Sequence, residues 1–168
     1  MNMLENNQLD TALGLRENRK KSSLYYKELC MARYACICAL GHPLAQHASL
    51  TMRQLSAAGN FIACTPRPFP DSFFSVQNHL LSNLPPVNRF LTDNMDSALA
   101  LVKAQIGYTI YPDIPAARDR DLRYIPITDL PAASFGVYCR PDHDLPVLKR
   151  FLALMGESLS LPPLPDAT

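Results

Sequence analysis

Short apolar segments alternate with amphipathic segments along almost the whole chain of 168 residues. The apolar segments have the length of strands and lie at residues 9–15, 24–40 (two pieces), 61–64, 87–91, 107–111, 122–127 and 134–139. Segments with apolar residues at helical spacing lie between several of them, at 52–58, 72–82 and 95–104, and one follows them at 145–159. Strands that alternate with helices are typical of an α/β domain with a largely parallel sheet. The sequence predicts this fold class.

The same pattern predicts where a ligand binds. In open α/β sheets, ligands bind beyond the carboxyl ends of the strands, where helices also begin. Four positions meet this condition: after Leu15, after Ala63, at residues 92–95 and after Ile110. We expect a binding site at one or more of these strand ends.

The charge pattern argues against a DNA-binding module. The formal net charge is +1, and only 18% of the residues are charged, with both signs interspersed. Proteins that wrap nucleic acid usually concentrate basic residues on one face or helix. The one basic cluster (Arg16, Arg19, Lys20 and Lys21) falls in a predicted loop, and a solvated loop is the simpler interpretation. We therefore predict no DNA-binding residues in this chain.

The cysteines and the hydropathy predict a cytoplasmic protein without a metal or cofactor. The five cysteines have no spacing that suggests a disulfide framework. Cys36 and Cys38 share one face of a predicted strand, but a tetrahedral metal site needs two further ligands, and the sequence offers no suitable pair. Core packing is the preferred interpretation of these thiols. The sequence shows neither a secretion signal nor an apolar run of about 18 residues.

No combination of side chains predicts catalysis. Ser72 and Ser75 lack the glycines of a nucleophile turn, and none of the four histidines has a partner at metal-ligand spacing. The segment Asp142-His143-Asp144 comes nearest to an acid–base group, but it is typical of a polar turn before a helix. We predict that the chain is not an enzyme.

Several segments, in order, resemble the effector-binding (substrate-binding) domain of LysR-type transcriptional regulators. They are Leu9-Asp10-Thr11-Ala12-Leu13-Gly14, Gly41-His42-Pro43-Leu44-Ala45 followed by residues 50–55, the helix–glycine–strand–proline element at 98–112, the strands at 122–127 and 136–140, and the final helix from residue 145. The resemblance covers nearly the whole chain. It implies a two-lobe fold like that of type II periplasmic binding proteins.

Two departures from the family pattern stand out. The family normally has a glycine two positions before Gly107, where a helix ends in left-handed geometry, and this chain has Gln105. That geometry costs glutamine about 1 kcal/mol relative to glycine, so we expect a strained or remodelled helix end. A full regulator also carries a winged helix-turn-helix, a linker helix and a first βαβα segment before Leu9, so we expect an N-terminally truncated domain.

The resemblance implies a domain division. Residues 1–16 and 131–160 would form a partial first lobe, residues 17–130 a complete second lobe, and residues 161–168 a flexible tail. In the family, a small effector binds between the lobes. The half of the site retained here would consist of Arg16, Cys64, Thr65, Thr92, Asn94, Met95, Tyr111 and Pro112.

These residues have expected roles. Thr65 offers a hydroxyl and backbone donors, and Thr92 and Asn94 lie at a helix start that favours an anion. Arg16 could pair with that charge. Tyr111 and Pro112 would form an apolar wall. A plain helix cap for Thr92 or Asn94 and a solvated loop for Arg16 remain alternatives.

The expected function is the sensing of a small, anionic metabolite by a regulatory domain without its own winged helix-turn-helix. The expected partners are the effector and either a second copy of the chain or an intact LysR-type regulator, with no membrane and no direct DNA contact. A freestanding small-molecule-binding or interaction module without a transcriptional role is the alternative.

Overall fold

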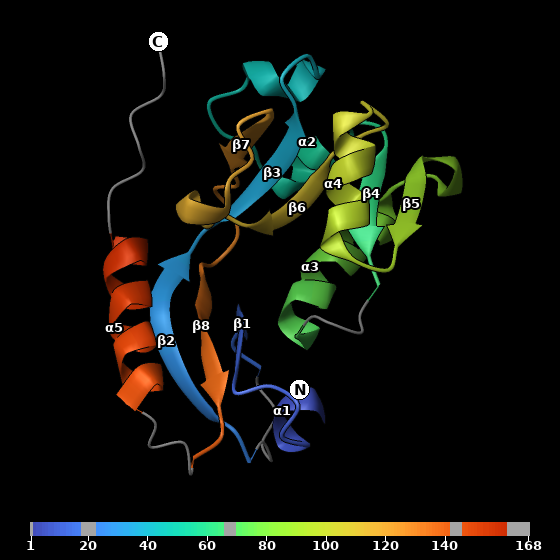
Figure 1. Ribbon diagram of the computed structural model, residues 1–168. Helices are drawn as coiled ribbons and strands as arrows, with labels where there is room; N and C mark the ends of the chain where they lie inside the picture. Colours follow the sequence, from blue (N-terminus) through green and yellow to red (C-terminus); the bar gives the residue numbers. More distant parts are fainter. Residues whose placement is uncertain (1, 18–22, 66–69, 142–145, 161–168) are drawn as a thin grey trace. The chain divides into compact units, whose positions relative to one another are not determined.

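The computed structural model describes residues 2–17, 23–65, 70–141 and 146–160 (Figure 1). Contacts divide the chain into two compact units. Unit 1 comprises Met1–Ala32, Ile114–Ala117 and Ala133–Thr168, and unit 2 comprises Arg33–Asp113 and Arg118–Ala132. The expected tail (161–168) and the Asp142-His143-Asp144 turn lie outside the described residues. No described helix is both long and apolar enough to cross a membrane.

Unit 1 is built on a three-stranded antiparallel sheet in the order β1-β8-β2. Its elements are α1 (Asn2–Glu5), β1 (Thr11–Leu15), β2 (Tyr25–Ala32), η3 (Pro115–Ala117), β8 (Ala133–Cys139) and α5 (Pro146–Ser160). The central strand β8 is the last strand in the sequence, and α5 packs against β2 and η3 (Figure 1). The register between β2 and β8 shifts between Glu28 and Cys30, so β2 carries a bulge there.

The second lobe was expected to begin at residue 17, but the first boundary between the units lies later in the sequence. Strand β2 lies within the range expected for the second lobe, but it pairs with β8 from Tyr25 to Ala32. Main-chain pairing of this length fixes β2 in the same unit as β8, and the boundary falls between Ala32 and Arg33. Sequence patterning could not reveal this, because an apolar strand does not specify its neighbour.

Unit 2 contains two sheets joined edge to edge. Strands β3 (Tyr34–Ala39), β6 (Thr109–Pro112) and β7 (Leu122–Pro126) form an antiparallel sheet in the order β6-β3-β7, and β4 (Phe61–Cys64) pairs in parallel with β5 (Arg89–Thr92). A parallel bridge between Phe61 and Tyr108 links β4 to β6. The Ile62 N–H donates to the Tyr108 carbonyl at 2.8 Å, and the Tyr108 N–H donates to the Asn60 carbonyl at 3.0 Å.

The prediction of a largely parallel sheet is therefore wrong for most strand pairs. Among the strands that the structure describes, only β4 and β5 pair in parallel, and β6 joins them through the bridge at Tyr108. Strand β3 runs antiparallel to both of its neighbours. The βαβ alternation that predicts parallel pairing holds only for β4, β5 and β6, which follow one another through α3 and α4.

The helices of unit 2 differ in how their first turns are capped. They are η1 (Pro43–Gln46), α2 (Met52–Leu55), α3 (Asp71–Asn83), η2 (Pro86–Asn88) and α4 (Met95–Lys103). Thr51 and Gln54 form a capping box at α2. Helix α2 is shorter than expected and ends before Gly59, whose φ is +93°. Helix α3 has no side-chain cap, because Pro70 precedes it and Asp71 is its first residue.

The end of α4 shows the predicted strain. Gln105 has a φ of +60°, in the left-handed region where a Cβ is unfavourable. Two residues later the chain returns to the sheet at Gly107, where an added Cβ would lie 2.2 Å from the Asn60 carbonyl oxygen. Glycine is required at that position, because β6 approaches the backbone before β4 so closely.

Helix α4 covers one face of the joined sheets. Ala98 and Val102 of α4 are fully buried against Ile62 and Cys64 of β4 and Ile37 of β3. The core that results fixes the start of α4 beside the ends of β4 and β5, which is where the sequence predicts a ligand site.

Candidate functional site

The carboxyl ends of β4 and β5 bring three predicted residues together. Cys64 and Thr92 are opposite each other in the parallel pair, and the Thr65 N–H donates to the Thr92 carbonyl at 2.8 Å. Cys64 is 2% exposed and Thr92 9%, whereas Thr65 is half-buried. The backbone donor expected from Thr65 is therefore already used. The Thr65 hydroxyl makes no hydrogen bond in the part of the chain that the structure describes.

The start of α4 adjoins this pair. Asn94 is the N-cap, and its side-chain oxygen accepts from the Ser97 N–H at 2.8 Å. The Thr92 hydroxyl lies 3.1 Å from the Asn94 carbonyl and 3.3 Å from the Ala63 carbonyl, to which it can donate. The plain capping role is thus present for Asn94, and Thr92 holds the turn that leads into the helix.

A sulfur contact completes the cluster. The Cys64 Sγ lies 3.7 Å from the Met95 Sδ and 3.6 Å from the Thr92 hydroxyl. Burial raises the pKa of the Cys64 thiol, so the thiol stays protonated near neutral pH and contributes a small, apolar surface. We refer to Cys64, Thr65, Thr92, Asn94 and Met95 as the strand-end cluster.

Two carboxylates flank the strand-end cluster. Asp93 accepts a hydrogen bond from the Asn94 side-chain amide at 2.8 Å, and Asp96 lies in the first turn of α4. Both side chains belong to exposed residues. They oppose the partial positive charge of the helix start, so this helix end attracts an anion less strongly than its backbone alone would.

Tyr111 and Pro112 end the neighbouring strand β6. The Tyr111 ring packs on the core cluster that contains Cys64, and its centroid lies 5.6 Å from that of Phe73 in an edge arrangement. Burial, and secondarily the neighbouring Cys64, raise the pKa of Tyr111, so the phenol stays neutral. Pro112 is buried and pairs with Tyr34 of β3. These two residues were expected to form an apolar wall of the site. Tyr111 is half-buried, whereas Pro112 is buried within the sheet.

Arg16 belongs to unit 1 and is described with that unit alone. It follows β1, and its N–H donates to the Ser134 carbonyl at 2.9 Å. Its guanidinium lies 5.8 Å from the centroid of the Tyr26 ring, within the range of a cation–π contact. The residue is exposed.

Sequence reasoning missed Gln77. Its side chain is fully buried on α3, and its oxygen accepts from the Cys64 N–H at 3.0 Å, while its Nε2 has no hydrogen-bond partner in the described residues. The apolar neighbour Val76 is half-buried, whereas Gln77 lies inside. The available signal was a polar residue at the i+4 position from Phe73 and the i−3 position from Leu80.

A separate pocket of unit 2 has a volume of about 450 Å³. Its lining residues are Arg33, Pro126, Ile127, Thr128, Leu130 and Ala132. Arg33 and Ala132 are the first and last residues of unit 2 in the sequence. Arg33 forms no ion pair in the described residues, so the pocket combines an available cation with the apolar side chain of Ile127.

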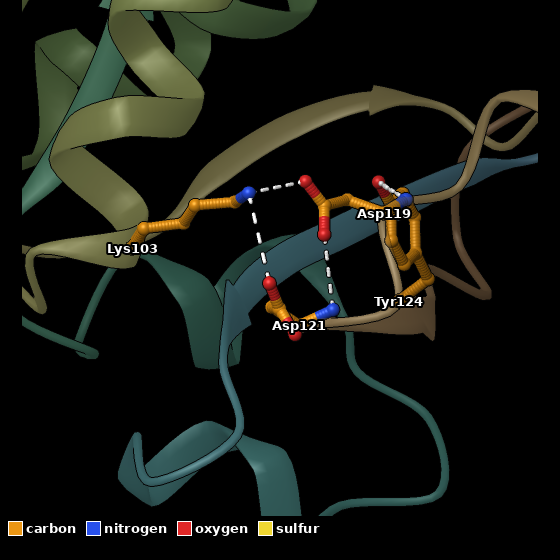
Figure 2. A network of polar contacts seen from close by, with 4 residues as sticks. All are labelled: Lys103, Asp119, Asp121 and Tyr124. Atoms are coloured by element: carbon orange, nitrogen blue, oxygen red, sulfur yellow. Dashed lines mark hydrogen bonds and ion pairs between the residues drawn. The ribbon is translucent and has the colours of Figure 1, made fainter.

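A polar network lies at the other end of α4 (Figure 2). The Lys103 Nζ lies 2.5 Å from an Asp119 oxygen and 4.0 Å from an Asp121 oxygen. The Asp121 N–H donates to Asp119, whose own N–H donates to the Tyr124 hydroxyl. The hydrogen bond between Lys103 and Asp119 raises the pKa of Lys103 and lowers that of Asp119. These groups are partly exposed and attach the end of α4 to the turn before β7.

The described residues contain no group of three or more His, Cys, Asp or Glu side chains that could hold a metal ion. Cys36 and Cys38 are both fully buried on β3, and hydrogen bonding between the two thiols raises the pKa of Cys36. The two thiols thus pack in the core of unit 2.

The chain matches the family model described as the LysR substrate binding domain over residues 1–160. Its fold is similar to that of a putative LysR family transcriptional regulator, PA01 protein from Pseudomonas aeruginosa, at 15% identity and a TM-score of 0.69, covering 95% of this chain and 56% of that one. The regulatory domain of MetR from N. meningitidis, in a form with two cysteines replaced by serine, gives 22% identity, a TM-score of 0.62, and coverages of 99% and 79%.

The effector binding domain of QuiR in complex with shikimate is also similar, at 18% identity and a TM-score of 0.62, with 92% of this chain and 73% of that one covered. A search of curated proteins found no match. The chain spans just over half the length of the PA01 regulator. With the match over residues 1–160 and this fold, the chain belongs to the LysR substrate-binding domain family, whose members are effector-binding domains with the fold of type II periplasmic binding proteins.

Proposed function

We propose that unit 2 binds a small effector at the strand-end cluster and that the domain is the sensing part of a LysR-type transcriptional regulator. The observation that carries this proposal is the convergence of Cys64, Thr92 and Met95 at the ends of two parallel strands and the start of a helix. Ligands bind at such strand ends in α/β folds. Effector binding would favour one arrangement of the domain over another and so alter regulation.

The proposed effector is a small metabolite with an acid group and hydroxyls. The free hydroxyl of Thr65 supports hydrogen bonding to such a molecule, and the QuiR domain of similar fold was solved with shikimate, a hydroxylated carboxylic acid. Asp93 and Asp96 reduce the attraction of α4 for negative charge. We therefore propose that hydroxyl and backbone groups of unit 2 hold the ligand.

A thermal-shift screen tests this proposal directly. The panel contains hydroxylated carboxylates, their uncharged amides and matched amines. Binding stabilises the folded state by about 2.7 kcal/mol when the ligand is present at 100 times its dissociation constant. We expect the carboxylates to raise the melting temperature and Thr65→Val to reduce that rise. No stabilisation by any member of the panel would contradict the proposal.

The Arg33 pocket provides the matched control. Arg33→Gln removes the cation of that pocket and leaves the strand-end cluster unchanged. We expect Arg33→Gln to bind the stabilising carboxylate as the wild type does. If Arg33→Gln loses the effect and Thr65→Val keeps it, the ligand binds in the pocket, and the assignment to the strand ends is wrong.

A freestanding binding or interaction module without a transcriptional role is the alternative function. Co-expression with an intact LysR-type regulator and its reporter distinguishes the two. A transcriptional role predicts a reporter change that depends on Thr65, whereas a freestanding module predicts none. We propose that this chain makes no direct DNA contact and acts in the cytoplasm, and a mobility-shift assay with operator DNA checks the first point.

A further inference from the structure

The Arg33 pocket lies at the opposite edge of the joined sheets from the strand-end cluster. Strands β7, β3, β6, β4 and β5 follow one another across these sheets. The strand-end cluster begins at the ends of β4 and β5, whereas the pocket is lined by residues 126–128, at the end of β7 and directly after it. Strands β3 and β6 lie between the two places. The pocket is therefore a separate site.

One wall of the pocket is fixed by backbone hydrogen bonds. The Ile127 N–H donates to the Tyr34 carbonyl at 2.9 Å, and the Thr128 N–H donates to the Leu50 carbonyl at 2.9 Å. The Leu50 N–H donates in turn to the Pro126 carbonyl at 3.0 Å, so neighbours on both sides hold this segment. A wall that is already ordered loses little conformational entropy when a ligand binds.

The positive charge of Arg33 has no carboxylate partner in the described part of the chain, because the acidic residues close to it in the fold are used elsewhere. The Asp113 N–H donates to the Arg33 carbonyl at 2.7 Å, but its carboxylate accepts two hydrogen bonds from Arg118, at 2.7 and 2.5 Å. The carboxylate of Asp129 accepts from the Met52 N–H, at 3.0 and 3.1 Å from its two oxygens. The charge of Arg33 is thus available to an anion from solution.

We propose that the Arg33 pocket is a second ligand site of unit 2 and binds a small monocarboxylate with an apolar body. The guanidinium of Arg33 can hold a carboxylate through two parallel hydrogen bonds. Ile127, Leu130 and Ala132 provide apolar lining for the rest of the molecule. The volume of about 450 Å³ lies toward the lower end of the range of about 300–1,000 Å³ for small-molecule sites, which suits a small ligand.

This ligand differs in kind from the one proposed for the strand-end cluster. Thr128 supplies the hydroxyl of the pocket lining, and that hydroxyl already lies 3.4 Å from the Leu50 carbonyl, to which it can donate. The pocket therefore favours an apolar body over a hydroxylated one. Binding here does not require binding at the strand ends, so either proposal can fail without the other.

The pocket also joins the two ends of unit 2 in the sequence. Arg33 is the first residue of the unit and Ala132 is its last, and both line the pocket. A ligand that contacts both residues holds the two ends together, as the bond between Ile127 and Tyr34 does. We expect a bound ligand to slow hydrogen exchange of the Ile127 and Thr128 amides, because local opening then requires release of the ligand.

Isothermal titration of the full chain with hexanoate tests the proposal, with uncharged hexanamide as the matched ligand. We expect hexanoate to bind at one site and hexanamide to bind at least about tenfold more weakly, because a hydrogen-bonded charge pair contributes that much or more. Arg33→Gln should weaken hexanoate binding by the same factor. Arg53→Gln is the matched control, since Arg53 is an exposed arginine of unit 2 on α2 and should bind hexanoate as the wild type does.

Two further variants locate the ligand. Ala132→Phe fills the pocket without changing its charge, so it should abolish hexanoate binding and the slower exchange at Ile127, while the melting temperature stays within a few degrees of the wild type. Thr65→Val should leave hexanoate binding unchanged. A wild type that does not bind hexanoate, an equal effect of Arg53→Gln, or loss of binding in Thr65→Val but not in Ala132→Phe overturns the proposal.

Discussion

The two units differ in how completely their strands are covered. In unit 2, β3 and β4 are buried along their whole length, and α4 closes one face of the joined sheets. In unit 1, the sheet has only three strands among the described residues, and Leu13 on β1 and Tyr25 and Met31 on β2 are exposed by about half or more. Burial of apolar surface is the main source of stability. Unit 2 should therefore be the more stable unit and should tolerate internal changes least.

The largest expected losses of stability come from substituting two glycines, one in each unit. At both positions a backbone carbonyl oxygen lies too close for a Cβ. An added Cβ would lie 2.2 Å from the Asn60 carbonyl at Gly107 and 2.2 Å from the Lys27 carbonyl at Gly136. We expect Gly107→Ala to destabilise unit 2 by about 3 kcal/mol or more, because the sheet around it is covered and cannot shift. Gly136→Ala should cost about 2 kcal/mol, because β2 is an edge strand.

Hydrogen exchange of the amides in β4 and β6, compared with those in β1 and β8, measures the two changes separately. Each variant should accelerate exchange mainly in its own unit. An equal loss of stability in the two units would contradict the comparison. It would show that the sheet of unit 1 accommodates an added Cβ no better than the covered sheet of unit 2.

Two buried tyrosine hydroxyls test the comparison at a smaller scale. Tyr108 donates to the Leu55 carbonyl at 2.6 Å in unit 2, and Tyr138 donates to the Leu15 carbonyl at 2.9 Å in unit 1. Tyr108→Phe and Tyr138→Phe should each destabilise their unit by about 1–2 kcal/mol, because a buried carbonyl loses its donor. Urea unfolding followed by local exchange should show the larger cost in unit 1, because the Tyr138 hydroxyl also accepts a hydrogen bond from the Glu17 N–H.

Gln105→Gly should stabilise unit 2 by about 0.5–1 kcal/mol, as left-handed geometry favours glycine. The gain should appear as a higher melting temperature without faster exchange in unit 1. Ala104→Gly, one position earlier and outside the left-handed region, is the control and should destabilise. A loss of stability in Gln105→Gly would mean that contacts of the Gln105 side chain outweigh the backbone strain.

The smallest effect concerns the network in Figure 2. The Lys103 hydrogen bond lowers the pKa of Asp119 below its value in the unfolded chain, so its contribution is present above about pH 3.9 and is lost as the pH falls through the lower folded value. Asp119→Asn should therefore lower the melting temperature slightly at pH 7 and not at all in strong acid. Asp121→Asn is the control, because Asp121 is 83% exposed and 4.0 Å from Lys103.

Local features of the fold could be predicted from the sequence because they depend on neighbouring residues. The cap at Asn94 and the strained end at Gln105 are of this kind, and the structure confirms both. The meeting of Cys64 with Thr92 also followed from local reasoning, since successive parallel strands end at the same edge.

Features that depend on distant pairing could not be predicted. The antiparallel direction of β3 and the pairing of β2 with β8 are set by partners that lie far away in the sequence. Gln77 was missed because helical spacing does not distinguish it from Val76. The hydrogen bond from the Cys64 N–H keeps the polar side chain inside, and that bond is visible only in three dimensions.

The position of β8 has a consequence for synthesis. Because β8 lies between β1 and β2 in the sheet but follows both of them late in the sequence, neither strand has its partner until residues 133–139 leave the ribosome. Residues 33–113 and 118–132 have by then all been made, so unit 2 can assemble first. During that interval the backbone N–H and C=O groups of β1 and β2 lack their partners in β8. Unpaired strand edges favour aggregation, so a chaperone would act on the chain at this stage.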